Sequence, residues 1–114
     1  MSEEFIAVAT KEVNDDIQEI DNILKLCHND DDVFQNSNKF QKHTHKIKGL
    51  APMMGKEDLG NFSSTLDDVF KKIIEGKRYE TIFDMVTISV EQMKKSMNEP
   101  NFDLSQINDQ IKQL

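Results

Sequence analysis

The residues best suited to chemistry in this chain are His45, Lys48 and Gly49, which form an H-x-x-K-G pattern. Each residue of an α-helix turns by about 100°, so Lys48 lies one turn beyond His45 and Gly49 lies almost directly above it. An exposed imidazole could accept a phosphoryl group as a nucleophile, and a neighbouring lysine would offset the added negative charge. The missing side chain at Gly49 would let another molecule approach. The pattern therefore favours a phosphate-accepting histidine on a helix surface.

The helical wheel separates His45 from the other two histidines. With Phe40 at zero, the apolar residues of its segment cluster within about 80° of it; they are Ile47, Leu50, Ala51 and Met54. His43 falls about 60° from Phe40, whereas His45 falls about 140° away, almost opposite the apolar face. We therefore predict a packed or boundary position for His43 and an exposed one for His45. His28 falls in a turn.

Gly49 and Pro52 both weaken a helix. A glycine inside a helix costs about 1 kcal/mol relative to alanine, and Pro52 loses the amide bond to the Lys48 carbonyl and clashes with it. The wheel places both residues on the outward side. We interpret them as a surface shaped for docking. The alternative is a close helix–helix contact at Gly49 and a plain kink at Pro52.

Apolar spacing along the whole chain predicts an all-α fold with five helices. Their expected ranges are about 3–27, 32–54, 56–75, 79–97 and 103–113. Gly55 and Gly76 suit helix ends, and Asp103 with Gln106 resembles a capping box. Four long amphipathic helices with short connections predict an up-down-up-down antiparallel four-helix bundle over about 3–97, followed by a short fifth C-terminal helix.

The length of 114 residues fits a single domain, 1–114. The lone Cys27 cannot form an internal disulfide, which favours a reducing, cytoplasmic setting.

A net charge of −7 argues against nucleic acid and anionic membranes as partners. No signal peptide is recognised, no stretch approaches the roughly 20 apolar residues of a membrane span, and no surplus apolar stripe demands a dimer, so we expect a monomer.

Metal binding and hydrolysis are poorly supported. His43 and His45 are two residues apart on a helix and point about 200° apart, so they cannot share a metal ion. The chain contains no G-x-S-x-G, no P-loop and no Gly-rich ATP-binding sequence. We therefore expect no metal, no cofactor and no enzymatic activity of its own.

The run HKIKGLAPMMG, residues 45–55, resembles a known pattern, H-x-L-K-G-x-A-x-x-x-G. This pattern belongs to histidine phosphotransfer (HPt) domains, in particular the amino-terminal phosphotransfer domains of CheA-type chemotaxis kinases. The resemblance extends over most of the chain. It implies a phosphocarrier in two-component signalling. His45 would be the acceptor, Lys48 the adjacent cation, and Gly49 the clearance for the partner's active site.

The resemblance also implies partners and supporting residues. The donor would be a histidine kinase catalytic domain or a phosphorylated receiver, and the recipient a response-regulator receiver domain; ATP and magnesium would come from partners. CheA-type domains often carry a histidine and a glutamate on the third helix that bond with the acceptor. Ser64 and Asp67 stand at those positions here, and Asp67 could still fix the imidazole tautomer. Pro52 is a further departure from the pattern.

Two other interpretations remain open at this point. One is a helical bundle that binds a receiver or kinase without being phosphorylated. The other is a fragment of a CheA-type kinase, whose ATP-binding and dimerisation domains are not present in these residues. Phosphorylation of His45 distinguishes the first alternative from a phosphocarrier.

Overall fold

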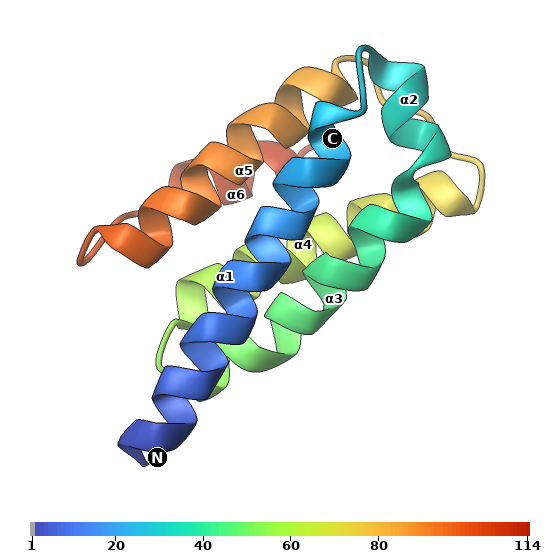
Figure 1. Ribbon diagram of the computed structural model, residues 1–114. Coiled ribbons are helices and arrows are strands. Elements are labelled where there is room, and N and C mark those ends of the chain that lie inside the picture. The colour runs from blue at the N-terminus through green and yellow to red at the C-terminus, as the bar shows by residue number, and fades with distance from the viewer. Residues whose placement is uncertain (1) are drawn as a thin grey trace.

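The computed structural model describes residues 2–114, which form six helices and no strand (Figure 1). The helices are α1 (Glu3–Lys25), α2 (Asp30–Gln35), α3 (Ser37–Met53), α4 (Glu57–Ile74), α5 (Ile82–Asn98) and α6 (Ser105–Lys112). The all-α prediction is confirmed. Within residues 2–114, no helix combines the length and apolarity required to cross a membrane.

The single helix predicted over 32–54 is wrong, because the structure contains two helices there. α2 ends at Gln35, α3 begins at Ser37, and Asn36 lies between them. The Asn36 side chain donates a hydrogen bond to the Asp32 carbonyl at 2.8 Å. Such local side-chain bonds compete with continuation of a helix. α2 also begins earlier than predicted, because the Asn29 side chain caps it by accepting from the Asp32 amide.

The predicted capping box at Asp103 and Gln106 is also wrong. The Asp103 carboxylate accepts from the Ser105 amide, only two residues on, at 2.9 Å. The helix α6 then starts at Ser105, after the buried Leu104. This contact is a local Asx turn, in which the Asp103 side chain bonds the amide two residues on. A capping box would need it to bond the amide of Gln106, three residues on.

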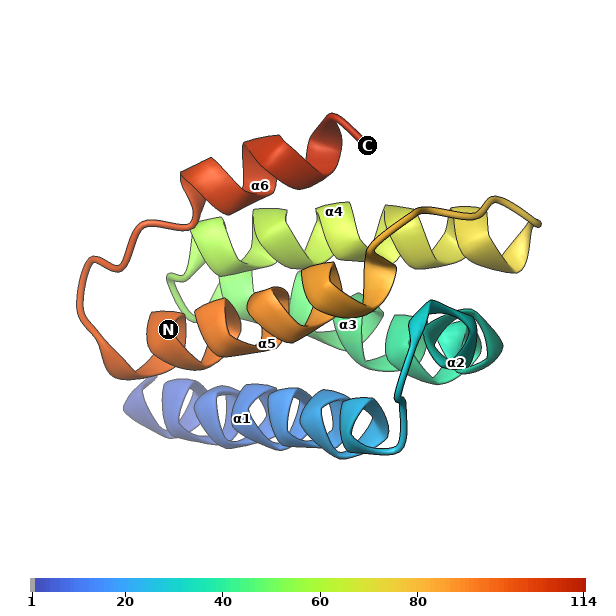
Figure 2. The same cartoon turned by 90° about the horizontal axis from the view of Figure 1, so that it is seen from above.

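The helices α3 and α4 are the pair that positions the candidate site. α1 packs on α3 and α5, while α6 lies along α4 (Figure 2). Phe40 of α3 stacks on Phe70 of α4 with ring centroids 5.2 Å apart, and both rings are buried. Because Phe40 is near the start of α3 and Phe70 is near the end of α4, the two helices run antiparallel.

α3 and α4 approach each other closely at Pro52 and Gly60. A Cβ atom added to Gly60 would lie 2.5 Å from the Pro52 Cγ atom. A close helix–helix contact therefore lies at Gly60, where the Pro52 ring packs against α4. Pro52 is also exposed, as the wheel predicts, and its part in docking stays a prediction. Gly49 differs, because it is exposed and a Cβ there would meet no atom within 4 Å.

We expect Gly60→Ala to lower the free energy of unfolding by about 1–3 kcal/mol, the usual cost of overpacking. Gly49→Ala is the matched control, and should raise it by about 1 kcal/mol, since only helix propensity changes there. Urea unfolding of both variants beside the wild type measures these differences. A Gly60→Ala variant as stable as the wild type would show that the Pro52 ring moves aside freely.

Candidate functional site

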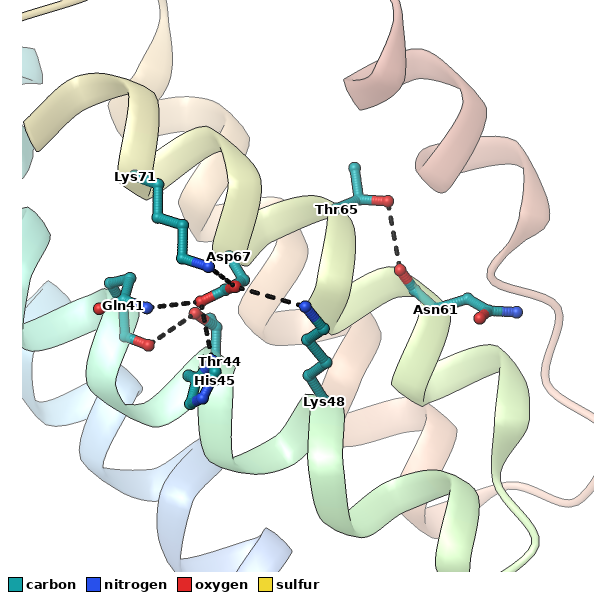
Figure 3. A network of polar contacts seen from close by, with 8 residues as sticks. All are labelled: Gln41, Thr44, His45, Lys48, Asn61, Thr65, Asp67 and Lys71. Carbon is teal, nitrogen blue, oxygen red and sulfur yellow. Dashed lines mark hydrogen bonds and ion pairs between the residues drawn. The ribbon is translucent and has the colours of Figure 1, made fainter. Parts of the chain in front are cut away.

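His45 lies in the middle of α3 with its side chain 61% exposed, as the helical wheel predicts. Its Nδ1 atom lies 3.6 Å from Oδ1 of Asp67 on α4 (Figure 3). This distance exceeds that of a normal hydrogen bond. The Asp67 side chain is itself completely buried. The imidazole is therefore beside a buried carboxylate, with the rest of its ring toward solvent.

Asp67 is the centre of a polar cluster between α3 and α4 (Figure 3). The Gln41 side chain donates a hydrogen bond to Oδ1 at 2.7 Å. The Lys71 ammonium lies 3.1 Å from Oδ2, and the Lys48 ammonium lies 3.8 Å from the same oxygen. Both lysine side chains are nearly half exposed. One carboxylate thus holds an amide and two cations next to His45.

The surroundings of Asp67 favour its ionised form. Burial by itself raises the pKa of this carboxyl group. The hydrogen bond from Gln41, the close ion pair with Lys71 and the charge of His45 together outweigh burial, so the pKa lies below its usual value. Asp67 is therefore negatively charged at neutral pH, where it can attract an imidazole proton.

The low pKa makes the stability of the fold depend on pH. A carboxyl group with a lower pKa in the folded state stabilises the fold above its unfolded pKa, here 3.8, and loses that effect as the pH falls through the folded value. We expect the difference in unfolding free energy between wild type and Asp67→Asn to shrink as the pH falls below 3.8. Urea titrations at pH 7 and between about pH 4 and 2 measure this. A difference independent of pH would contradict it.

The structure brings together three of the five residues predicted for the site. His45, Lys48 and Asp67 share one cluster. Gly49 borders the cluster, with open space above its Cα atom. Ser64 is partly exposed on α4, one turn before Asp67, and no hydrogen bond joins it to His45 in the part of the chain that the structure describes.

Sequence reasoning missed Gln41 and Lys71. Gln41 precedes His45 by four residues, and Lys71 follows Asp67 by four. Side chains four residues apart are neighbours on a helix surface, so the sequence places Gln41 near His45 and Lys71 near Asp67. This spacing assigns Gln41 and Lys71 to one site only once His45 and Asp67 are known to face each other.

His43 lies on another side of α3. Its Nδ1 atom is 2.8 Å from Oδ1 of Asp16 on α1, and its side chain is 14% exposed, which confirms the predicted boundary position. The two histidines therefore contact different helices, as their separation on the wheel predicts. Within residues 2–114, no three side chains of the metal-binding types are grouped closely enough to hold an ion.

Comparisons of the chain with protein-family models, with curated proteins and with solved structures found no match. The resemblance of residues 45–55 to phosphotransfer domains therefore depends on residue types and spacing alone. What the structure adds is the cluster that surrounds His45.

Proposed function

We propose that this chain is a phosphocarrier of two-component signalling. His45 accepts a phosphoryl group from a histidine kinase catalytic domain or a phosphorylated receiver, and passes it to an aspartate of a response-regulator receiver. One observation carries the proposal: an exposed imidazole whose Nδ1 atom faces the buried, ionised Asp67. The family resemblance at residues 45–55 supports it independently.

The geometry favours one ring nitrogen as the nucleophile. The negative charge of Asp67 stabilises the tautomer with its proton on Nδ1, which leaves the lone pair on Nε2. When Nε2 attacks phosphorus, the bond between phosphorus and the oxygen of the donor breaks. The ring then becomes positively charged and draws closer to Asp67, so the 3.6 Å separation would shorten to a hydrogen bond.

The two lysines supply charge for the phosphoryl group. Asp67 balances only one of Lys48 and Lys71, so the cluster holds one unit of excess positive charge while His45 is neutral. A phosphoryl group brings nearly two negative charges at neutral pH. Because both ammonium groups end partly exposed chains, they can turn from Asp67 toward the phosphoryl oxygens.

The proposal extends to the architecture and the partners. We infer that α1, α3, α4 and α5 form an up-down-up-down antiparallel four-helix bundle, with α6 added on α4. The partner's active site would dock over His45 and the open space at Gly49. The chain would act as a cytoplasmic monomer, and ATP would bind only to the kinase partner.

A second candidate is a bundle that binds a receiver or a kinase domain without being phosphorylated. The separation of 3.6 Å between His45 and Asp67 favours this candidate, because the imidazole lacks a hydrogen bond that would fix its tautomer.

Phosphotransfer with radiolabelled phosphate distinguishes the two candidates. The protein is offered a panel of phosphorylated receivers, and CheA-type catalytic domains with ATP. Label that is acid-labile, base-stable and located on His45 by peptide mass spectrometry supports the phosphocarrier. Binding of a receiver or kinase domain to the folded protein with no transfer of label supports the second candidate and overturns the first.

A further inference from the structure

The helix α3 carries a second set of the same residue types that surround His45. His43 and Lys46 repeat the spacing of His45 and Lys48, two residues earlier in the chain. Asp16 of α1 supplies the carboxylate of this set. Its Oδ1 atom lies 2.8 Å from Nδ1 of His43 and 3.1 Å from the ammonium group of Lys46. We call these three residues, His43, Lys46 and Asp16, the second cluster.

The contact with the carboxylate is tighter in the second cluster than at His45. A distance of 2.8 Å is that of a true hydrogen bond, whereas 3.6 Å at His45 is not. An ionised carboxylate can only accept, so a neutral His43 beside it has its proton on Nδ1 and its lone pair on Nε2. Asp16 thereby imposes on His43 the tautomer that a phosphoacceptor needs.

Asp16 itself is only partly satisfied. Its side chain is 3% exposed, and its second oxygen, Oδ2, is buried with no hydrogen-bond partner in the described part of the chain, as is Oδ2 of Asp67. Buried polar atoms without a partner are rare in folded proteins and call for an explanation. A buried carboxylate that lacks a hydrogen bond is stabilised more strongly than an exposed one by a positive charge on the ring of His43.

Access is the second difference between the two histidines. The His43 side chain is 14% exposed against 61% for His45, whereas the Lys46 side chain is half exposed. We expect a side chain this buried to be out of reach of the active-site cleft of a folded partner. A small molecule needs less open surface, so the exposed 14% of the His43 side chain favours a small donor.

We propose that His43 is a second phosphoacceptor, which takes its phosphoryl group from small phosphoramidate-type donors. The Nε2 lone pair attacks the phosphorus of phosphoramidate, a new N–P bond forms, and the N–P bond of the donor breaks to release ammonia. Nδ1 keeps its proton, and Asp16 balances the positive charge of the ring. Lys46 offsets the charge of the phosphoryl group. This second site does not depend on phosphotransfer at His45.

The test uses potassium phosphoramidate, with peptide mass spectrometry at neutral pH to locate the label. His28 is an internal reference, because it is an exposed histidine in the turn before α2. In His45→Gln, we expect His43 to be phosphorylated at least about tenfold faster than His28, the size of effect that a supporting carboxylate has on a functional histidine. Lys46→Gln, a change at a half-exposed position, should slow labelling of His43 and leave His28 unchanged.

A rate at His43 no greater than that at His28 overturns the inference, whatever happens at His45. Label on His43 from phosphoramidate, with no label on His45 from phosphorylated receivers or kinase domains, supports the inference and overturns the proposed function. Label on His43 from phosphorylated receivers would overturn its restriction to small donors. Asp16→Asn, with Asp15→Asn as the exposed neighbouring control, tests the carboxylate: equal labelling of His43 in the two variants overturns the role of Asp16. Circular dichroism checks that each variant is folded.

Discussion

His45→Gln is expected to reduce phosphorylation by receivers and kinase domains to background. The glutamine amide has no nucleophilic lone pair on nitrogen, so no N–P bond can form at this position. The unfolding free energy should change by less than about 0.5 kcal/mol, because the ring is largely exposed and makes no hydrogen bond to Asp67. Transfer of radiolabelled phosphate and urea unfolding, measured on the same preparation, check both parts.

His28→Gln is the matched control for this variant. It removes an exposed histidine in the turn before α2 and should leave phosphotransfer from protein donors at the wild-type rate. Full labelling of His45→Gln by a receiver or kinase domain would mean that another residue is the acceptor.

Asp67→Asn is expected to slow phosphotransfer to His45 by about 10–100-fold at pH 7, the usual cost of losing a residue that orients a functional histidine. The neutral amide cannot balance the positive charge that the ring gains when Nε2 is phosphorylated. Lys48 and Lys71 also lose the charge that holds them near the site. Single-turnover transfer from a phosphorylated receiver measures the rate.

Two further substitutions separate chemistry from folding at this position. Asp68→Asn changes the exposed neighbouring carboxylate and should transfer at the wild-type rate. Asp67→Glu restores a carboxylate and should recover much of the lost rate. If Asp67→Asn transfers as fast as the wild type, the carboxylate serves only to hold α3 and α4 together.

The directions of side chains on α3 could be predicted from the sequence. Phe40, Ile47 and Ala51 are buried, His43 is at the boundary and His45 is exposed, all as the wheel indicates. Positions within one helix are related by a fixed rotation, so they need no knowledge of other helices.

The break between α2 and α3 could not be predicted in the same way. Val33 and Phe40, on either side of Asn36, are both buried and seven residues apart, which is also the spacing of one continuous helical face. The side chains of Asn36 and Ser37 bond the carbonyls of Asp32 and Val33 at this break, and such bonds leave no trace in the apolar pattern.

Contacts between helices could not be predicted from the sequence, except where the family resemblance indicated them. The resemblance pointed to Asp67, but nothing indicated that Asp16 meets His43, and the spacing of Lys71 from Asp67 was informative only once Asp67 was known to face His45. Such contacts depend on which helices pack together and on how far one is shifted along the other.

The contact between Pro52 and Gly60 has a consequence for the alignment of His45 with Asp67. Going back seven residues from Pro52 along α3 leads to His45, and going forward seven from Gly60 along α4 leads to Asp67. Because the helices are antiparallel, both steps cover the same two turns, about 10.5 Å. The proline ring thus sets the spacing at which the carboxylate meets the imidazole. A methyl group at Gly60 would change the distance between the His45 imidazole and the Asp67 carboxylate from two turns away, without altering any polar residue.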